Sequence, residues 1–413
     1  MDEFISGYVN LLKTVLGSGI LSFPGLFAVY GVYNAIILAF ISAFLSASGL
    51  KIYALCSKKL GRSATLSTLA ANSIPSLQRI VELSVFIKCL GVSTTYLIII
   101  KQLLPHVTAK YNINIFFIPI FAQLGIFVIL ISPLCYFKKI DSLKHTSLCG
   151  LLAIFFLLIV SICRLFQNII LNFSTVDIFK AMKIQILDNS FKSPSIEWIT
   201  NIGKFIFAFT CHQNMFTVHN EMQDNSEQKM SRLIKSVIIS ALVVYCLFGI
   251  SNYLLYGDKL SDNILEAYPN DLITSLVYIF YILVMSFSYP LQLSPCRIYA
   301  LNFLGLSFNR SSSELIARII STTILIIFTY TIAVSGIKLG TVYSIIGATA
   351  STIICFIIPP IFYFNLEIQR TRKYDIVAIF LLSIGVFVLS ITLLNSISSK
   401  LIELYHITVN KKL

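Results

Sequence analysis

Charged side chains are scarce in this sequence: Asp, Glu, Lys and Arg together account for only 12% of its 413 residues. An ordinary soluble domain carries about 25%. Hydrophobic residues make up 57% of the chain, and the mean hydropathy is +0.85. Apolar runs of roughly 18 residues or more indicate helices that cross a bilayer. The composition therefore argues against a soluble protein and predicts an all-α, polytopic membrane protein that has the lipid bilayer as a partner.

Several functional motifs are also missing. The sequence has no Gly-x-x-x-x-Gly-Lys-[Ser/Thr] loop for ATP, so primary pumping is not expected. The nine cysteines show neither metal spacing nor a disulfide framework, so we expect no metal, no cofactor and no enzyme activity. The net charge of +13 sits in short clusters between apolar runs, where orientation signals belong, so nucleic acid is not an expected partner. A channel, or an intramembrane enzyme using His212, His219 and Glu221, stays as an alternative.

Apolar windows of about 20 residues divide the chain into about 11 predicted spans. They lie near 5–30, 32–56, 77–104, 114–137, 144–166, 197–221, 232–256, 271–301, 315–335, 339–364 and 374–398. Basic residues gather in alternate loops, beginning with Lys58, Lys59 and Arg62, which predicts a cytoplasmic N-terminus. We expect one transmembrane domain over 1–413, and a monomer.

Two of these windows look interrupted near their centres. The first contains LLKTVLGSGILSFPGLF, from Leu11 to Phe27, with a Gly-Ser-Gly step and a proline. The second contains GKFIFAFTCHQNMFTVHNE, from Gly203 to Glu221, where polar residues break the apolar run. Five spans separate them, and because five is odd the two halves insert with opposite orientation. This pattern predicts inverted repeats over about 5–166 and 197–364, with an extra helix over 374–398.

An interrupted helix explains why a membrane span contains helix-breaking residues such as glycine and proline. Glycine leaves helical geometry at low cost, and the backbone groups that it frees must line something polar, because lipid cannot bond them. The N-terminus of a half-helix favours a carboxylate, and freed carbonyls suit a cation or an ammonium group. A zwitterionic amino acid carries both groups. The alternative is that the Gly-Ser-Gly step is only a small-residue packing face.

The same segments resemble those of a known family. They are LLKTVLGSGILSFP (11–24), IKCLGVSTTYLIIIKQLLP (87–105), FAFTCHQNMFTVHNE (207–221), YGDKLSDNILEAYP (256–269) and FSYPLQLSPCR (287–297). Together they resemble the amino acid/auxin permease family, most closely its fungal vacuolar amino acid permeases and more distantly the sodium-coupled neutral amino acid transporters. The resemblance implies a LeuT-type fold with a five-plus-five inverted repeat and broken helices one and six. It also implies secondary active transport of amino acids by alternating access, in a vacuolar, other endomembrane or plasma membrane.

The resemblance also implies which residues bind the substrate. It assigns the unwound part of span one to Gly17, Ser18, Gly19 and Ile20, whose backbone would bind the substrate carboxylate. The matching part of span six would be Phe207, Ala208, Phe209, Thr210 and Cys211. On span three, Ser93 and Tyr96 are the candidates for part of the substrate-binding floor.

A lysine stands where the resemblance implies an ion site. In sodium-coupled relatives an asparagine occupies the position of Lys13, and side chains matching Ser288 and Ser286 complete the sodium site. An ammonium group there would repel Na⁺, so we hypothesise H⁺ coupling, with Lys13 as the titrating group or as a fixed substitute for the cation. The alternatives are sodium symport, a non-transporting amino-acid sensor of the same fold, and a Lys13 side chain that snorkels to the interface.

Lys88 is a second lysine inside an apolar window, that of span three. Facing lipid it would cost about 3 kcal/mol, so it should face the protein interior. One interpretation is a charge on the substrate pathway that welcomes acidic side chains. The other is a buried tether to carbonyls or to a carboxylate such as Glu82.

Overall fold

The computed structural model of the protein describes residues 3–110, 119–137, 143–171, 192–306 and 311–410, and every regular element in these ranges is a helix. The α-helices are α1 (Glu3–Leu16), α2 (Phe23–Tyr30), α3 (Val32–Leu60), α4 (Leu66–Ser73), α5 (Gln78–Lys110), α6 (Ile120–Cys135), α7 (Leu143–Leu171), α9 (Ile196–Ala208), α10 (His212–Glu221), α11 (Glu227–Tyr256), α12 (Leu272–Phe303), α13 (Ser311–Val334), α14 (Leu339–Ile346), α15 (Ile358–Asn365) and α16 (Arg372–Asn410). Short helical turns join some of them, among them the 3₁₀ turns η1 (Gly19–Ser22) and η6 (Ile264–Ala267) and the π-helical turns η7 (Gly347–Ser351) and η8 (Ile353–Ile357).

Each predicted window contains at least one of these helices, so the expectation of an all-α, multi-pass membrane protein is confirmed. By length and composition, eight helices in the described ranges can cross a membrane, or nine when α1 and Gly19–Tyr30 count as one bent span. Helix α6 is apolar but shorter, and the pair α9 and α10 is not among those that qualify. The count of about 11 spans and the repeat boundaries therefore stay predictions.

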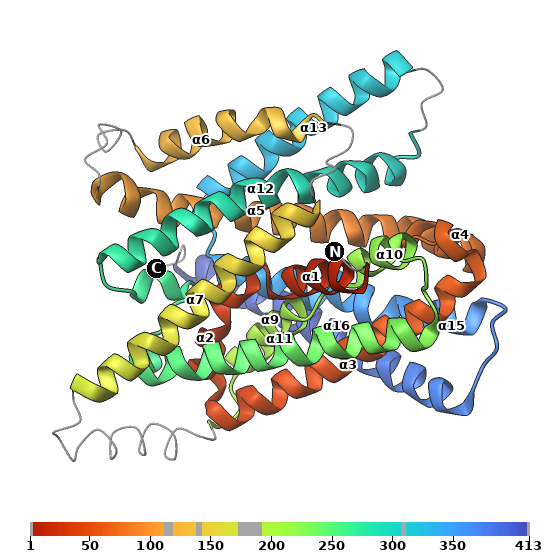
Figure 1. Ribbon diagram of the computed structural model, residues 1–413, viewed down its shortest axis with the longest axis horizontal. Coiled ribbons are helices and arrows are strands. Elements are labelled where there is room, and N and C mark those ends of the chain that lie inside the picture. The colour runs from red at the N-terminus through yellow and green to blue at the C-terminus, as the bar shows by residue number, and fades with distance from the viewer. Residues whose placement is uncertain (1–2, 111–118, 138–142, 172–191, 307–310, 411–413) are drawn as a thin grey trace.

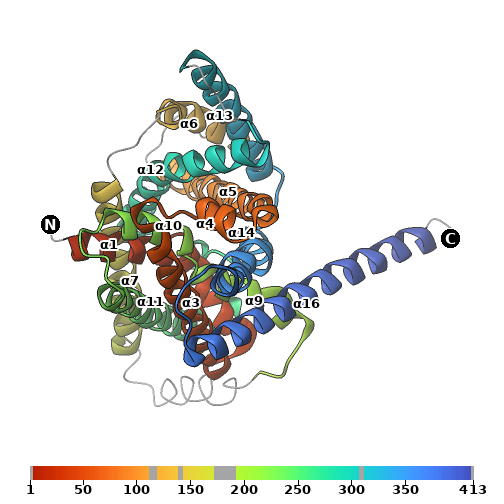
Figure 2. The same cartoon turned by 90° about the vertical axis from the view of Figure 1, so that its right-hand side faces the viewer.

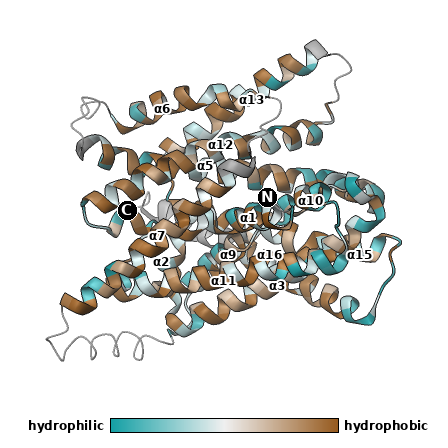
Figure 3. Cartoon of the chain, viewed as in Figure 1, coloured by the Kyte–Doolittle hydropathy of each residue, from teal (hydrophilic) through white to brown (hydrophobic). Residues whose placement is uncertain are grey.

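The helices run broadly along one axis of the molecule (Figure 1). We call the end that holds α4 and the C-terminus of α10 the α4 end, and the opposite end, near α2, the α2 end. Hydrophilic residues gather around α4 and α15 at the α4 end, whereas hydrophobic residues dominate along the helices (Figure 3). This distribution matches a bundle that crosses an apolar layer and meets water at its ends.

Helix α1 packs against α7, α11 and α10, α9 packs against α14 and η7, and α5 packs along α12. The most apolar window of α5 is 78% buried, but only 22% of the corresponding windows of α13 and α16 is buried. Figure 2 shows α6 and α13 together at the edge of the bundle and α16 extending away from it. The outer helices therefore present their apolar side chains to lipid, while α5 belongs to the core.

One helix crossing depends on two glycines. The backbone of η7 lies against α9, and a Cβ built on Gly347 would overlap the carbonyl group of Gly203. The widened turn of η7 frees backbone groups, and the Thr352 hydroxyl donates to the Gly347 carbonyl at 2.8 Å. The sequence did not indicate these π-helical turns, because the window 339–364 reads as one continuous apolar span.

We predict that Gly347→Ala destabilises the fold, because the added methyl group has no space between two backbones. Overpacking of this kind costs about 1–3 kcal/mol. The measurement is the thermal unfolding midpoint of the purified protein in detergent. Gly125→Ala in α6 is the matched control, because its Cβ would lie 3.4 Å from the Tyr330 hydroxyl, an ordinary contact. Equal midpoints for the two variants would contradict the prediction.

Candidate functional site

The first break lies between α1 and α2. Helix α1 ends at Leu16, and Gly17 adopts φ +26°, a left-handed conformation that favours glycine. Gly19 and Ile20 then enter the 3₁₀ turn η1, and Gly19–Tyr30 is bent from α1 by 40°. The break is shorter than predicted, since only Gly17 and Ser18 lie outside a helix. The Ser22 hydroxyl donates to the Gly19 carbonyl at 3.2 Å and supports this turn.

The second break separates α9 from α10 and comprises Phe209, Thr210 and Cys211. Phe207 and Ala208, which the sequence analysis placed in the unwound part, still belong to the last turn of α9. The prediction of a break here is right, and its start is two residues too early. The apolar Phe-Ala-Phe run carries no signal for where the helix ends.

A single hydroxyl group joins the two breaks. Tyr245 of α11 lies with its hydroxyl 2.8 Å from the Val15 carbonyl, 3.5 Å from the Leu16 carbonyl and 3.1 Å from the Ala208 carbonyl. These carbonyls are at the C-terminal ends of α1 and α9, where helices leave acceptors without intrahelical donors. The sequence analysis missed Tyr245, because nothing in the periodicity of α11 distinguishes it from a packing aromatic.

Three further helices bond the remaining backbone of the breaks. The Ser46 hydroxyl of α3 donates to the Phe209 carbonyl at 2.6 Å, and the Lys88 ammonium group of α5 lies 3.4 Å from the Thr210 carbonyl. The Tyr343 hydroxyl of α14 donates to the Ser18 carbonyl at 2.9 Å. The unwound carbonyls of both spans are thus held by side chains from separate elements.

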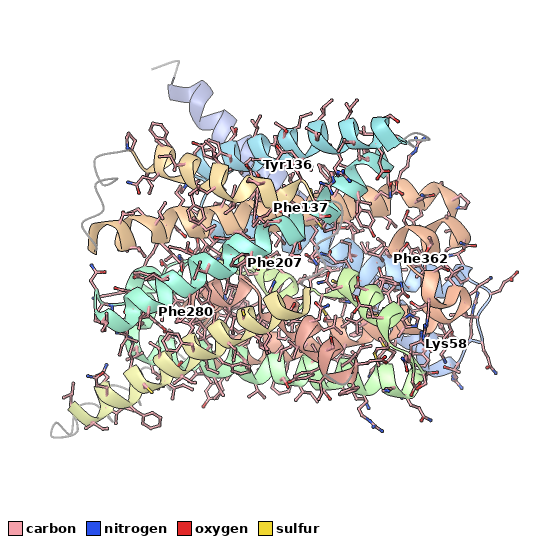
Figure 4. The ribbon with its side chains drawn as sticks, turned by 45° about the horizontal axis from the view of Figure 1, so that its top comes forward. Lys58, Tyr136, Phe137, Phe207, Phe280 and Phe362 are labelled. Atoms are coloured by element: carbon pink, nitrogen blue, oxygen red, sulfur yellow. The ribbon has the colours of Figure 1, made fainter. Side chains whose placement is uncertain are left out.

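A cavity of about 460 Å³ begins at the breaks and extends toward the α4 end. Its lining includes Gly17, Ser18, Gly19, Tyr96, Phe207 and Thr210 near the breaks, Lys13, Thr14, Lys88, Gln213, Asn214, Ser288 and Gln292 along its walls, and Thr65, Thr217 and Asn220 toward the α4 end. Thr65 and Thr217 are exposed, whereas Tyr96 and Phe207 are buried. Figure 4 shows Phe207 near the middle of the bundle and Lys58 at its far end. The cavity is therefore open at the α4 end and closed at the breaks, and its volume is typical of small-molecule pockets.

Not every predicted site residue lines this cavity. Ile20, Ser93, Ala208, Phe209, Cys211 and Ser286 are buried but absent from its lining. Ser286 donates instead to the Ile282 carbonyl of its own helix at 2.5 Å. The binding roles of the residues that do line the cavity stay predictions.

Lys13 reaches into the bundle from α1. Its ammonium group donates to the Ser288 hydroxyl of α12 at 3.0 Å, and its side chain passes beside Gly150 of α7. The two residues that the sequence analysis paired at the ion site are therefore in contact. The ammonium group points into the bundle. The alternative that the Lys13 side chain snorkels to the membrane interface is therefore not what the structure shows.

Lys88 does not pair with Glu82. The Glu82 carboxylate accepts from Ser67 at 2.7 Å and from Gln78 at 2.8 Å, within the α4 end of the bundle. Lys88 is only 3% exposed and has the Thr210 carbonyl as its hydrogen-bond acceptor. Of the two tethers considered from the sequence, the structure contains the one to a carbonyl.

Aromatic rings close the cavity toward the α2 end. Phe207 and Tyr343 pack with tilted rings whose centroids are 4.6 Å apart, and the Tyr343 hydroxyl donates to the Ser18 carbonyl. Beyond them, a second hollow of about 850 Å³ lies at the α2 end. An ion pair between Lys204 and Asp262, at 2.6 Å, lies on its wall. Two hollows therefore approach the breaks from opposite ends, and one aromatic layer separates them.

His212 and His219 do not form a metal site in the described part of the chain, where no group of three or more His, Cys, Asp or Glu side chains is placed to hold an ion. The His212 Nδ1 atom lies 3.1 Å from the Cys355 sulfur, outside the cavity lining.

Comparisons with known proteins agree with this geometry. A family profile described as "Transmembrane amino acid transporter protein" matches residues 2–403. The chain is 30% identical to vacuolar amino acid transporter 5 of Schizosaccharomyces pombe, over 87% of this chain and 84% of that one, and 28% identical to vacuolar amino acid transporter 5 of Saccharomyces cerevisiae, over 94% and 96%. The human sodium-coupled neutral amino acid transporter 4 is 23% identical, over 92% of this chain and 81% of that one.

The fold also has a counterpart among solved structures. A manganese transporter of Eremococcus coleocola superposes with a TM-score of 0.53 at 14% identity, covering 96% of this chain and 85% of the other. At this identity the likeness concerns the fold alone, and it supports the expected LeuT-type arrangement.

We predict that Tyr245→Phe lowers stability more than an ordinary Tyr→Phe change. Removing the hydroxyl leaves buried carbonyls of two broken helices without a donor, which costs about 1–3 kcal/mol. Tyr330→Phe is the control, because its hydroxyl donates to the Phe121 carbonyl at 2.9 Å in an exposed setting. Thermal unfolding in detergent should show a clearly larger loss for Tyr245→Phe, and similar losses for both would count against this role of the hydroxyl.

Proposed function

The chain belongs to the transmembrane amino acid transporter family, and from that premise we propose that it is a secondary active transporter that moves amino acids by alternating access, coupled to protons. The observation that carries the proposal is the cavity at two broken helices, where backbone groups and a few polar side chains converge inside an apolar bundle. Discontinuous helices with bare backbone near mid-membrane are the typical substrate site of such transporters.

An amino acid fits the polar groups of this cavity. The N–H group of Gly19, the first residue of η1 and part of the cavity lining, suits the α-carboxylate. The Gln213 Oε1 atom is buried and has no hydrogen-bond partner among the described residues, and it suits the α-ammonium group. The break carbonyls are less available than the sequence analysis assumed, because Tyr245, Ser46 and Tyr343 already bond them.

Alternating access is supported by the one-sided opening of the cavity. The Phe207–Tyr343 layer and the Lys204–Asp262 ion pair lie between the breaks and the α2 end. Opening toward that end requires the Tyr343 hydroxyl to leave the Ser18 carbonyl, while the α4 end closes. Exchange between two such states would carry a bound solute across the membrane.

Proton coupling is supported by the position of Lys13. Its ammonium group bonds Ser288 where relatives with sodium coupling would need a vacant cation site. In the part of the chain that the structure describes, Lys88 is the other charged residue of the lining, which holds no Asp or Glu. A protonated lysine replaces the cation, and loss of its proton frees Ser288, so the lysine can couple proton movement to the change of state.

The distribution of basic residues and the similarity to vacuolar transporters favour one orientation and one membrane. Basic residues gather at the α4 end, among them Lys58, Lys59 and Arg62, which predicts that the α4 end and the N-terminus face the cytoplasm. The two fungal relatives are named vacuolar amino acid transporters, which favours the vacuolar membrane. We propose that the protein works there as a monomer, with its cavity open to the cytoplasm in this structure.

The test is amino acid uptake by purified protein in proteoliposomes, with pH and sodium gradients imposed separately. We expect uptake that persists without sodium and is lost when the pH gradient is clamped. Saturable sodium dependence would show sodium symport instead, and tight binding of an amino acid without any flux would show a sensor. No binding and no flux over a panel of amino acids would refute the proposed function.

Lys13→Ala should abolish accumulation driven by the pH gradient while leaving exchange of substrate across the membrane, because the cavity remains but its proton carrier is gone. Lys101→Ala is the matched control, since Lys101 is a half-buried lysine on α5 that bonds the Ala333 carbonyl away from the cavity. Proton-driven accumulation that survives in Lys13→Ala would remove Lys13 from the coupling mechanism.

A further inference from the structure

The charge of the cavity is unbalanced. Lys13 and Lys88 both line it, and among the described residues no Asp or Glu belongs to the lining. In the described part of the chain, no carboxylate lies within 4 Å of either ammonium group. Buried charges in proteins are normally paired, since an unpaired ion in an apolar interior is costly. A cavity of this composition therefore favours a solute that brings negative charge.

Lys88 has donors to spare. An ammonium group has three N–H bonds, and among the described residues the acceptor of Lys88 is the Thr210 carbonyl, at the long distance of 3.4 Å. Glu82, the nearest expected partner on the same helix, is engaged with Ser67 and Gln78. Two donor positions of Lys88 are consequently available to a group in the cavity.

A second donor lies across the cavity on α12, the helix that packs along α5. The Nε2 atom of Gln292 is buried and lies beside the Cys89 thiol, a weak acceptor, but no oxygen or nitrogen acceptor among the residues that the structure describes bonds it. Both Gln292 and Lys88 line the cavity, and the Gln213 Nε2 group, also in the lining, donates to the sulfur of Cys89, the residue after Lys88, at 3.8 Å. An ammonium group and an amide N–H₂ group on facing helices are a suitable pair for the two oxygens of one carboxylate.

On the premise of the proposed function, we propose that Lys88, assisted by Gln292, is a specificity-determining residue that selects amino acids with a carboxylate side chain. The α-carboxylate and α-ammonium groups bind at η1 and Gln213, and the side-chain carboxylate extends to Lys88 beside the second break. Lysine and arginine as substrates would place a third cation near Lys13 and Lys88 and are rejected. Neutral amides of the same shape leave the Lys88 charge unpaired and bind more weakly.

The experiment compares matched substrates in proteoliposomes: glutamate against glutamine, and aspartate against asparagine, with lysine as the cationic probe. For the wild-type protein we expect kcat/KM to be roughly tenfold or more higher for each acid than for its amide, and no measurable uptake of lysine. Lys88→Gln should abolish the preference or reverse it, and Lys88→Arg should keep it. Lys101→Gln, which removes a lysine outside the cavity, should leave the ratio unchanged.

The ratio of acid to amide separates this role from a purely structural one, because a loss of folding lowers uptake of both substrates equally. Gln292→Met is a second variant, for use if Lys88→Gln does not fold. Gln292 is half-buried, so its replacement is better tolerated. We expect it to raise the KM for glutamate several-fold while leaving the KM for glutamine unchanged. Equal changes in both would overturn the assignment.

Failure of this inference is distinguishable from failure of the proposed function. A wild-type protein that takes up neutral amino acids as well as or better than acids overturns the selectivity and leaves amino acid transport intact. A preference for acids that persists in Lys88→Gln overturns the role of Lys88. Absence of any amino acid flux or binding overturns the proposed function itself.

Discussion

Backbone hydrogen bonds inside an apolar bundle are the constraint on which this structure depends. Where α1 and α9 end inside the apolar bundle, their last carbonyls lose their intrahelical donors, and lipid offers none. Side chains of other helices donate to the carbonyls at the breaks. They are Tyr245 of α11, Ser46 of α3, Lys88 of α5 and Tyr343 of α14. Each donor belongs to a different helix, so the breaks can exist only inside the assembled bundle.

This dependence joins stability to function. Of the four donor helices, α5 lines the cavity at the breaks and α14 lines the second hollow. The proposed change of access would therefore have to exchange these hydrogen bonds rather than abandon them. Tyr343 shows the connection most directly, since one side chain bonds the Ser18 carbonyl and packs with a tilted ring against Phe207 in the layer that closes the cavity. In the proposed transport cycle, opening that layer and releasing that carbonyl would be one event.

Much of the fold could be predicted from the sequence, because apolar runs mark the membrane spans and glycine, proline or polar residues mark their interruptions. Gly17 marks the first break, and its positive φ explains why a glycine stands there. The pairing of Lys13 with Ser288, which the family resemblance implied, is a contact in the structure. The limits of the second break were not predictable, since Phe207 and Ala208 are helical and Phe209 is not, although all three are apolar. The role of Tyr245 and the packing of the π-helical turn η7 could not be predicted for a related reason: the backbone groups that they contact are distant in sequence.

The hydroxyl of Tyr245 has a mechanical consequence. It carries one hydrogen but lies within 3.5 Å of three acceptors, two on α1 and one on α9. A rotation about the C–O bond redirects that hydrogen from the Val15 carbonyl to the Ala208 carbonyl. The phenol can therefore bond the end of either helix without moving its ring.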